Sequence, residues 1–225
     1  MAEIYMVRHG QASFGADNYD QLSQLGHQQA QWLGEYFNSL GLQFDHIYQG
    51  DLVRHTETTA GIAKGLTTEF SRVNVMPELN EFDFKALVNV YLQQHPELSL
   101  PSKPSVKEFF HLLKQAMIDW CHGTLVSDQL PETWKGFHDR VAQAYNHIQQ
   151  HCSGKVLVVS SGGTNAQFIS QVLRTPAETV VDLNLQSRNT GVSHFYFNQH
   201  AVRLTSFNTT PHLDSAERQQ YITHG

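Results

Sequence analysis

Two periods of apolar residues alternate along this chain, and the alternation predicts strands that take turns with helices. Short apolar runs with the length of buried strands occur at 4–7, 45–49, 73–76 and 155–160. Apolar residues recur every three or four positions, as on one face of a helix, over about 25–40, 52–64 and 137–152. We therefore predict an α/β fold with three layers, in which helices flank a mostly parallel central sheet.

Local signals mark where several of these elements begin and end. Ser23 is placed to cap the first helix, and Gly41 is placed to end it. A later helix is expected to begin near Thr164, shortly after the strongest strand pattern. Towards the end of the chain, the pattern predicts a β-hairpin with strands at 193–198 and 202–207.

The alternation of strands and helices stops between residues 84 and 132. Four prolines punctuate two helical stretches in this segment, and no strand pattern occurs there. The second helix begins with the capping-box residues Ser105 and Glu108. We expect one domain over residues 1–225, with a helical cap inserted at about 84–132.

Composition and charge exclude several classes of protein. Of the 225 residues, 40% are hydrophobic and 16% are charged, so the chain can bury a core. The formal charge is −6, without any run of Lys or Arg, which argues against nucleic-acid partners and anionic membranes. Two cysteines provide no disulfide framework, and no stretch reaches the roughly 18 apolar residues of a membrane helix. These features predict a soluble, cytoplasmic protein.

Polar residues and glycines follow two of the predicted strands. Arg8, His9 and Gly10 come directly after the first strand, and Ser161 and Gly162 follow the strand at 155–160. Ligands of open α/β sheets bind beyond the carboxyl ends of strands, where a glycine-rich turn into a helix offers N–H groups to an anion. A phosphate group is the expected ligand, although each of these short motifs alone is more often structural.

Several motifs follow one another in a fixed order along the chain. They are Arg8-His9-Gly10, Leu22-Ser23-Gln24-Leu25-Gly26, Arg54 and Leu79-Asn80-Glu81. This ordered set resembles the histidine phosphatase superfamily, the phosphoglycerate-mutase-like group. The resemblance extends over most of the chain and is weakest at 84–132.

The resemblance implies a role for each matching residue. His9 corresponds to the nucleophile whose ring nitrogen accepts the phosphoryl group as phosphohistidine. Arg8 and Arg54 correspond to the guanidinium pair that binds the phosphoryl oxygens. Glu81 corresponds to the general acid, with Glu78 as the alternative if the alignment is displaced. The family chemistry implies no cofactor, and no spacing of histidines or cysteines in this chain implies a metal.

One position departs from the family pattern. Where the family usually has a second catalytic histidine followed by glycine, this chain has Ser161 and Gly162. The serine side chain is shorter than histidine, and its hydroxyl is a neutral hydrogen-bond donor. Losing a transition-state donor typically lowers the rate by roughly 10²–10³-fold. Both residues are still expected to contact the phosphoryl group. Gln11 and Gly15 also differ from the mutase pattern, which disfavours glycolytic mutase activity.

Three functions are consistent with these residues. The leading hypothesis is a cofactor-independent phosphatase, with weak activity, that acts through phospho-His9 on a small phosphorylated metabolite or a phosphopeptide. The second is a non-catalytic phospho-ligand-binding protein on the same fold. The third makes Ser161 a hydrolase nucleophile, and it is disfavoured because that motif needs glycine where Val159 stands. The other histidines, His55 among them, are expected to be surface or core residues.

Overall fold

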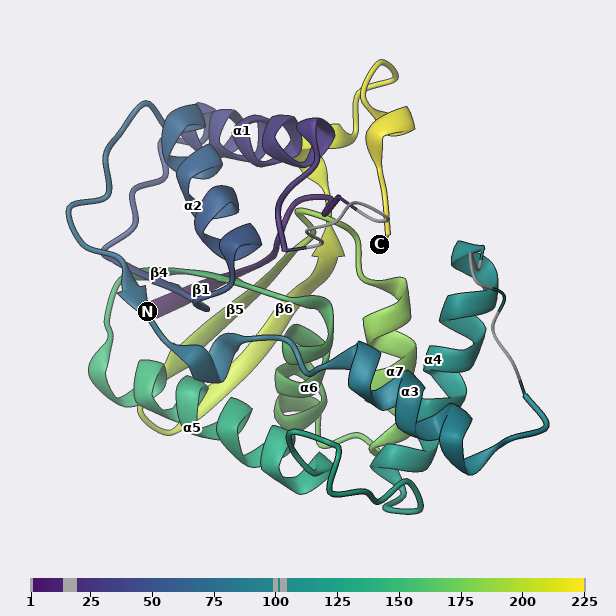
Figure 1. The fold of residues 1–225 in the computed structure, drawn as a ribbon. Coiled ribbons are helices and arrows are strands. Elements are labelled where there is room, and N and C mark those ends of the chain that lie inside the picture. The colour runs from purple at the N-terminus through teal and green to yellow at the C-terminus, as the bar shows by residue number, and fades with distance from the viewer. Residues whose placement is uncertain (1, 14–19, 99–100, 102–104, 225) are drawn as a thin grey trace.

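The computed structural model describes residues 2–13, 20–98, 101 and 105–224. The strands in this part of the chain form one sheet with the order β3-β2-β4-β1-β5-β6 (Figure 1). They are β1 Ala2–Arg8, β2 His46–Gln49, β3 Asn74–Val75, β4 Lys155–Ser160, β5 Val192–Asn198 and β6 Ala201–Thr209. Neighbouring strands from β3 to β1 are parallel, whereas β1–β5 and β5–β6 are antiparallel pairs. The predicted mostly parallel sheet is confirmed.

Helices cover both faces of this sheet. In the described part of the chain they are α1 Gln24–Ser39, α2 Val53–Gly65, α3 Phe84–Gln94, α4 Val106–Cys121, α5 Trp134–His151, α6 Gly162–Leu173 and α7 Glu178–Gln186. Figure 1 shows α1 and α2 on one face and α5 and α6 on the other. Successive side chains of a strand point to opposite faces. Accordingly Leu157 and Val159 join the core under α1 and α2, while Val156 and Val158 join the larger core opposite. The three-layer prediction is therefore confirmed.

The ends of the helices follow the local signals in most places. The Ser23 hydroxyl accepts a hydrogen bond from the Gly26 N–H at 3.0 Å, as expected for an N-cap. The capping box of Ser105 and Glu108 is complete. Gly41, with a φ of 64°, follows α1 as predicted. The predicted hairpin is formed by β5 and β6.

Two features of the helices differ from the predictions. Helix α6 begins at Gly162, two residues before the predicted start. Ser161, directly before it, is extended with φ −113° and ψ 168°. Helix α7 was not predicted, and it packs against both α4 and α6. Gly15 and Pro104, which entered the sequence interpretation, lie outside the described residues.

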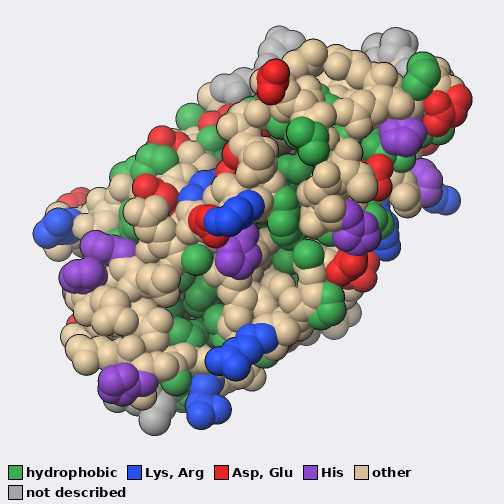
Figure 2. All heavy atoms as spheres, turned by 90° about the horizontal axis from the view of Figure 1, so that it is seen from below, with side chains coloured by type: hydrophobic (Ala, Val, Ile, Leu, Met, Phe, Trp, Pro, Cys, Tyr) green, Lys and Arg blue, Asp and Glu red, His purple; other side chains and the backbone are tan. Residues whose placement is uncertain are grey.

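The charged side chains are mixed on the molecular face seen in Figure 2. Basic, acidic and histidine side chains are interspersed there with apolar and uncharged polar ones. Within the described residues, no helix combines the length and the apolar character that crossing a lipid bilayer requires.

Candidate active site

The two polar strand ends singled out by the sequence lie side by side. Parallel pairing of β1 with β4 places Arg8 opposite Ser160. The chain then leaves both strands at the same edge, where the His9 N–H donates to the Ser160 carbonyl at 2.9 Å. Residues about 150 positions apart in sequence thus meet at one site, as expected for the carboxyl ends of neighbouring parallel strands.

His9 is buried and held in one orientation. Its Nδ1 lies 2.7 Å from the Gly10 carbonyl oxygen, which can only accept a hydrogen bond. Nδ1 therefore carries a proton, and Nε2 of the neutral ring carries the lone pair. Burial, the nearby Arg54 and Arg8 guanidinium groups and His55 hold the pKa of His9 well below its ordinary value. The ring is consequently neutral at physiological pH, as a nucleophile must be.

The loop after β1 is fixed by contacts with both covering helices. The Gly10 N–H donates to the Thr58 hydroxyl of α2 at 3.0 Å. A side chain at Gly10 would place its Cβ only 2.5 Å from the Gly26 carbonyl oxygen of α1, so this close approach requires glycine. On the other side of the loop, the Thr190 N–H donates to the carbonyls of Arg8 and His9. His9 therefore stands on a rigid loop.

The Arg8 and Arg54 side chains are nearly fully buried beside His9. Nη1 of Arg8 donates to the backbone carbonyls of Ser187 and His224, the second at 2.6 Å. Nη1 of Arg54, in the first turn of α2, donates to Oδ1 of Asp20 at 2.7 Å. The other Asp20 oxygen accepts from the Val53 N–H at 2.9 Å. Asp20 therefore fixes Arg54 and caps α2 with the same carboxylate.

Glu81 follows the short 3₁₀ helix Pro77–Leu79 and points towards the start of α6. Its Oε2 accepts a hydrogen bond from the Gly163 N–H at 2.9 Å. Burial raises the pKa of the carboxyl group, against the opposing effects of the Gly163 N–H, Arg54, Arg8 and Arg140. A carboxyl group with a raised pKa is suited to donating a proton.

One small cavity, of about 40 Å³, joins the four residues that the family pattern singled out. In the described part of the chain its lining residues are Arg8, His9, Arg54, Glu81, Phe82, Phe84, Phe109, Phe110, Leu113 and Asn184. The sequence-predicted nucleophile, guanidinium pair and acid therefore converge. Glu78, the alternative to Glu81, does not line this cavity.

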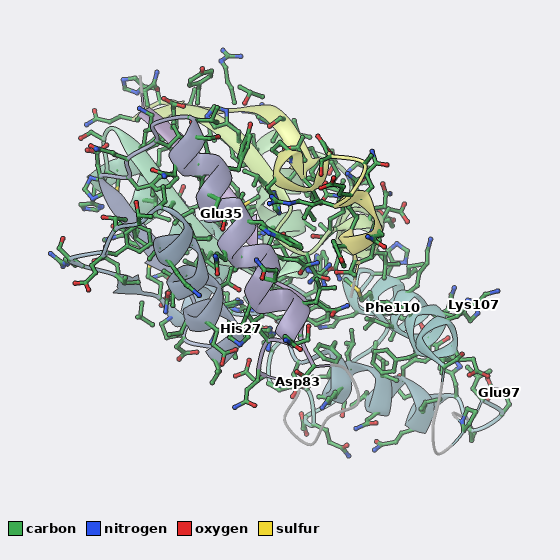
Figure 3. All side chains as sticks on the ribbon, turned by 90° about the horizontal axis from the view of Figure 1, so that it is seen from above. His27, Glu35, Asp83, Glu97, Lys107 and Phe110 are labelled. Atoms are coloured by element: carbon green, nitrogen blue, oxygen red, sulfur yellow. The ribbon has the colours of Figure 1, made fainter. Side chains whose placement is uncertain are left out.

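An apolar wall faces these polar groups across the cavity. We use this name for Phe84, Phe109, Phe110 and Leu113, which come from α3 and α4. The rings of Phe84 and Phe109 meet edge to face at 6.0 Å between centroids. In Figure 3, Phe110 lies on the part of α4 next to the rest of the molecule, whereas Lys107 lies farther out. The segment predicted to be a cap thus contributes side chains to the site.

Ser161 and Gly162 are not among the described residues that line this cavity. Both are buried, and their predicted contact with a phosphoryl group stays a prediction. The Ser161 hydroxyl lies 2.7 Å from Nε2 of His55, a fully buried histidine in the first turn of α2. The His55 and His9 rings lie 5.9 Å apart. His55 was expected to be a surface or core residue; it is buried, and its place beside His9 was missed.

Other residues of the site were also missed by sequence reasoning. Asp20 and Asn184 were not singled out as site residues, and they reach the site through the tertiary fold. Of the apolar wall, only Phe109 and Leu113 belong to the apolar stripe that the sequence shows along the second helix of the predicted cap. Such a stripe does not distinguish a core face from a binding face. The only signal in the sequence that could have placed His55 near the site was its position next to Arg54.

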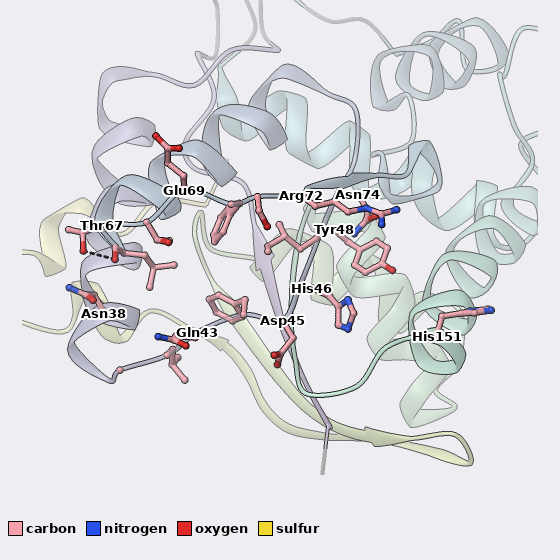
Figure 4. A pocket seen from close by; sticks show the side chains of 18 residues that line it. Asn38, Gln43, Asp45, His46, Tyr48, Thr67, Glu69, Arg72, Asn74 and His151 are labelled. Atoms are coloured by element: carbon pink, nitrogen blue, oxygen red, sulfur yellow. Dashed lines mark hydrogen bonds between the residues drawn. The ribbon is translucent and has the colours of Figure 1, made fainter.

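A larger cavity, of about 720 Å³, lies at the opposite end of the strands. Figure 4 shows it between the end of α1, the start of β2 and the segment around Arg72 and Asn74. Its lining contains none of the predicted site residues. Size therefore does not identify the site here, and the converging titratable groups do. No group of three or more His, Cys, Asp or Glu among the described residues is arranged to hold a metal ion.

Comparison with models of protein families finds one match that covers most of the chain. The model of the histidine phosphatase superfamily (branch 1) matches residues 4–210. No curated protein sequence matches the chain.

Several solved structures share the fold over nearly the whole chain. Phosphoglycerate mutase from Bacillus anthracis has a TM-score of 0.68 at 17% identity, covering 94% of this chain and 94% of that one. A phosphoserine phosphatase mutant from Entamoeba histolytica, in complex with phosphoserine, has a TM-score of 0.66 at 20% identity, covering 95% and 100%. The alpha-ribazole phosphatase from Shigella flexneri has a TM-score of 0.66 at 21% identity, covering 92% and 96%. At these identities the likeness shows the fold alone.

Proposed function

Because the chain belongs to the histidine phosphatase superfamily (branch 1), we propose that it hydrolyses phosphomonoesters through a phosphohistidine on His9. The observation that carries this proposal is the convergence of His9, Arg8, Arg54 and Glu81 on one cavity. The bond from His9 Nδ1 to the Gly10 carbonyl adds to it, because it leaves Nε2 as the nucleophilic atom.

In the first step, the lone pair of His9 Nε2 attacks phosphorus and the bond to the ester oxygen breaks. Glu81 gives its proton to that oxygen, and the alcohol leaves. Arg8 and Arg54 offset the negative charge on the phosphoryl oxygens during the transfer. The raised pKa of Glu81 and the lowered pKa of His9 each favour the protonation state that this step needs.

In the second step, the Glu81 carboxylate accepts a proton from water as the water oxygen attacks phosphorus. The nitrogen–phosphorus bond breaks, and its electron pair returns to His9 Nε2. Inorganic phosphate leaves, and both residues regain their starting protonation states. No cofactor is required by this sequence of steps.

For the substrate, we propose a small phosphorylated metabolite or a phosphopeptide whose leaving group is apolar beside the phosphate. The apolar wall supports this class, because a charged leaving group would lose hydration against it without gaining a partner there. We propose that residues 84–132 act as a substrate-selecting cap within one domain of residues 1–225. The cytoplasmic location stays a prediction.

The test is hydrolysis of a broad panel of phosphomonoesters by the wild-type protein and by His9→Ala. We expect turnover of several aryl and alkyl phosphates by the wild type, reduced at least about a thousandfold in the variant. A variant as active as the wild type on every substrate would contradict the proposal. Because Ser161 is a neutral donor, we expect weak activity for this fold.

A second candidate is a phospho-ligand-binding protein without catalysis. The carboxylate of Asp20 on Arg54 favours it, because this pair competes with phosphoryl oxygens for the same guanidinium. It predicts phosphate affinity that depends on Arg8 and Arg54, with no phosphoenzyme. Ser161→His separates the two functions: a large gain from near zero activity favours the binding protein, whereas no gain on a measurable rate favours the phosphatase.

A further inference from the structure

His55 and Ser161 form a buried polar pair that the proposed reaction leaves without a role. Both side chains are fully buried, and Nε2 of His55 lies 2.7 Å from Oγ of Ser161. The space for the imidazole depends on Gly50, because a Cβ at that position would collide with Nδ1 of His55. Burying an imidazole and a hydroxyl in an apolar core is unfavourable unless both are hydrogen-bonded. Each supplies a partner for the other.

The hydrogen bonds of the pair indicate its proton positions. Nδ1 of His55 is buried and has no hydrogen-bond partner among the described residues. A buried lone pair without a donor is tolerated more often than a buried N–H without an acceptor. The proton of the neutral ring therefore resides on Nε2, and Nε2 donates to the Ser161 oxygen. Burial and the Arg54 charge lower the pKa of His55, which keeps the ring neutral.

This arrangement leaves the Ser161 hydroxyl proton available to a ligand. A serine hydroxyl accepts and donates at once, and here the acceptor role is taken by His55. Ser161 stands at the N-cap of α6, yet its side chain makes no capping hydrogen bond. Nor does any other acceptor within the described residues bond to this hydroxyl.

The neighbours of Ser161 place this donor beside the reacting group. The preceding residue, Ser160, accepts the His9 N–H, and a Cβ at the following residue, Gly162, would lie 3.4 Å from Nε of Arg8. The His55 ring lies 5.9 Å from the His9 ring. Ser161 is thus enclosed by the imidazole of His55 and the Arg8–His9 segment.

We propose that the Ser161 hydroxyl donates to a phosphoryl oxygen during transfer to His9, and that His55 is the positioning residue that holds this hydroxyl. The proposal rests on the proposed function, since it adds a residue to the same site. His55 does not contact the phosphoryl group and acts through Ser161. The pair supplies a neutral, preorganised donor to the phosphoryl group.

The first experiment is a double-mutant cycle assayed with p-nitrophenyl phosphate. Ser161→Ala and His55→Leu should each lower kcat about tenfold to a hundredfold, with a smaller change in KM. The double variant should lose no more than the larger single loss, because both substitutions remove the same donor. Independent effects that multiply in the double variant, or unchanged kcat in both single variants, would overturn the proposal.

Two further variants separate positioning from packing. His55→Gln can present an amide N–H near the place of Nε2, and it should recover at least about tenfold over His55→Leu. If His55→Leu fails to fold, His55→Gln is compared with Ser161→Ala instead, and it should be at least about tenfold more active than Ser161→Ala. Ser170→Ala is the matched control, because Ser170 is a buried serine of the same helix that bonds to Thr175 at 2.7 Å. Its kcat should stay within about twofold of wild type. A glutamine no better than leucine would overturn the positioning role.

Binding of inorganic phosphate, measured by calorimetry, keeps this proposal distinct from the proposed function. Ser161→Ala and His55→Leu should each weaken phosphate binding about tenfold, and Ser170→Ala should not. If the wild type proves no more active than His9→Ala, the phosphatase proposal fails, and these affinities still test the donor pair. Unchanged phosphate affinity in both pair variants would overturn the donor role.

Discussion

The two sides of the cavity differ in origin and in chemistry. The polar side consists of Arg8, His9, Arg54 and Glu81, which stand at strand ends, at a helix start and on a short loop. The apolar wall comes from α3 and α4. Backbone groups hold Arg8, His9 and Glu81, and the Asp20 carboxylate holds Arg54. The polar side contains every titratable group of the cavity lining in the described chain. We therefore expect the polar side to set the rate on all substrates and the apolar wall to set which substrate is preferred.

Among the tests of these two roles, the largest effect on kcat/KM is expected from Glu81→Gln. Without the acid, an alkyl phosphate must expel an unprotonated alkoxide, and kcat/KM should fall roughly 10²–10⁴-fold. With p-nitrophenyl phosphate the loss should be much smaller, since that leaving group needs no proton. Glu78→Gln is the control, because Glu78 lies nearby in sequence but does not line the cavity. A larger loss of kcat/KM in Glu78→Gln than in Glu81→Gln would show that Glu81 is not the general acid.

The next largest effect is expected from Arg54→Met. Removing one guanidinium from the phosphoryl oxygens should lower kcat/KM roughly 10²–10³-fold, by a similar factor on every substrate. Steady-state kinetics on one aryl and one alkyl phosphate measure this. Arg218→Met provides the control, because Arg218 lies over the Trp32 ring at 4.7 Å and outside the cavity lining. A loss confined to one of the two substrates would break the proposed division between the two sides.

A smaller effect concerns pH. Glu81 must be protonated, so kcat/KM for an alkyl phosphate should fall about tenfold per pH unit above its raised pKa. His9 must be neutral, and its lowered pKa keeps it so well below the ordinary range of histidine. Activity should therefore be highest between the lowered pKa of His9 and the raised pKa of Glu81. The alkaline decrease should disappear in Glu81→Gln, and its persistence there would contradict the assignment.

The smallest effect is expected from the apolar wall. Phe110→Ala removes apolar surface that faces the leaving group, and it should change the preference for phenyl phosphate over glycerol 2-phosphate about tenfold. The ratio of the two kcat/KM values measures this. Val126→Ala is the control, since Val126 is 70% exposed. An equal loss on both substrates would show that Phe110 supports the chemistry instead of selecting the substrate.

The sequence predicted the layers of the fold better than the ends of its elements. The spacing of apolar residues shows which face of a strand or helix is buried, and this spacing can be seen within each short segment of the sequence. Ser23 and the Ser105–Glu108 box mark helix starts through contacts three residues away, so they were readable too. Helix α7 was missed; it packs on the preceding helix α6 and on α4, and α4 is distant from it in sequence. The two glycines at the start of α6 concealed its true beginning.

The candidate site likewise contains residues that the sequence predicted and residues that it did not. Arg8 and His9 were found from their place after a strand, and Arg54 and Glu81 only from the order of the family motifs. The contact of His55 with Ser161 joins residues 106 positions apart, and no spacing rule connects them. Asp20 on Arg54 is equally non-local. The His55–Ser161 pair depends on how α2 packs beside β4, and the Asp20–Arg54 pair depends on how α2 packs beside the segment before α1; a single sequence records neither.

The most direct test of the account is to trap the phosphorylated enzyme. Mixing Glu81→Gln with p-nitrophenyl phosphate and quenching in base should yield an acid-labile phosphoryl group on His9, because the second step then lacks its base. Phosphorus NMR and peptide mass spectrometry should place that group on Nε2, since Nδ1 is bonded to the Gly10 carbonyl. An unmodified His9, or an acid-stable phosphoryl group on Ser161, would contradict the account.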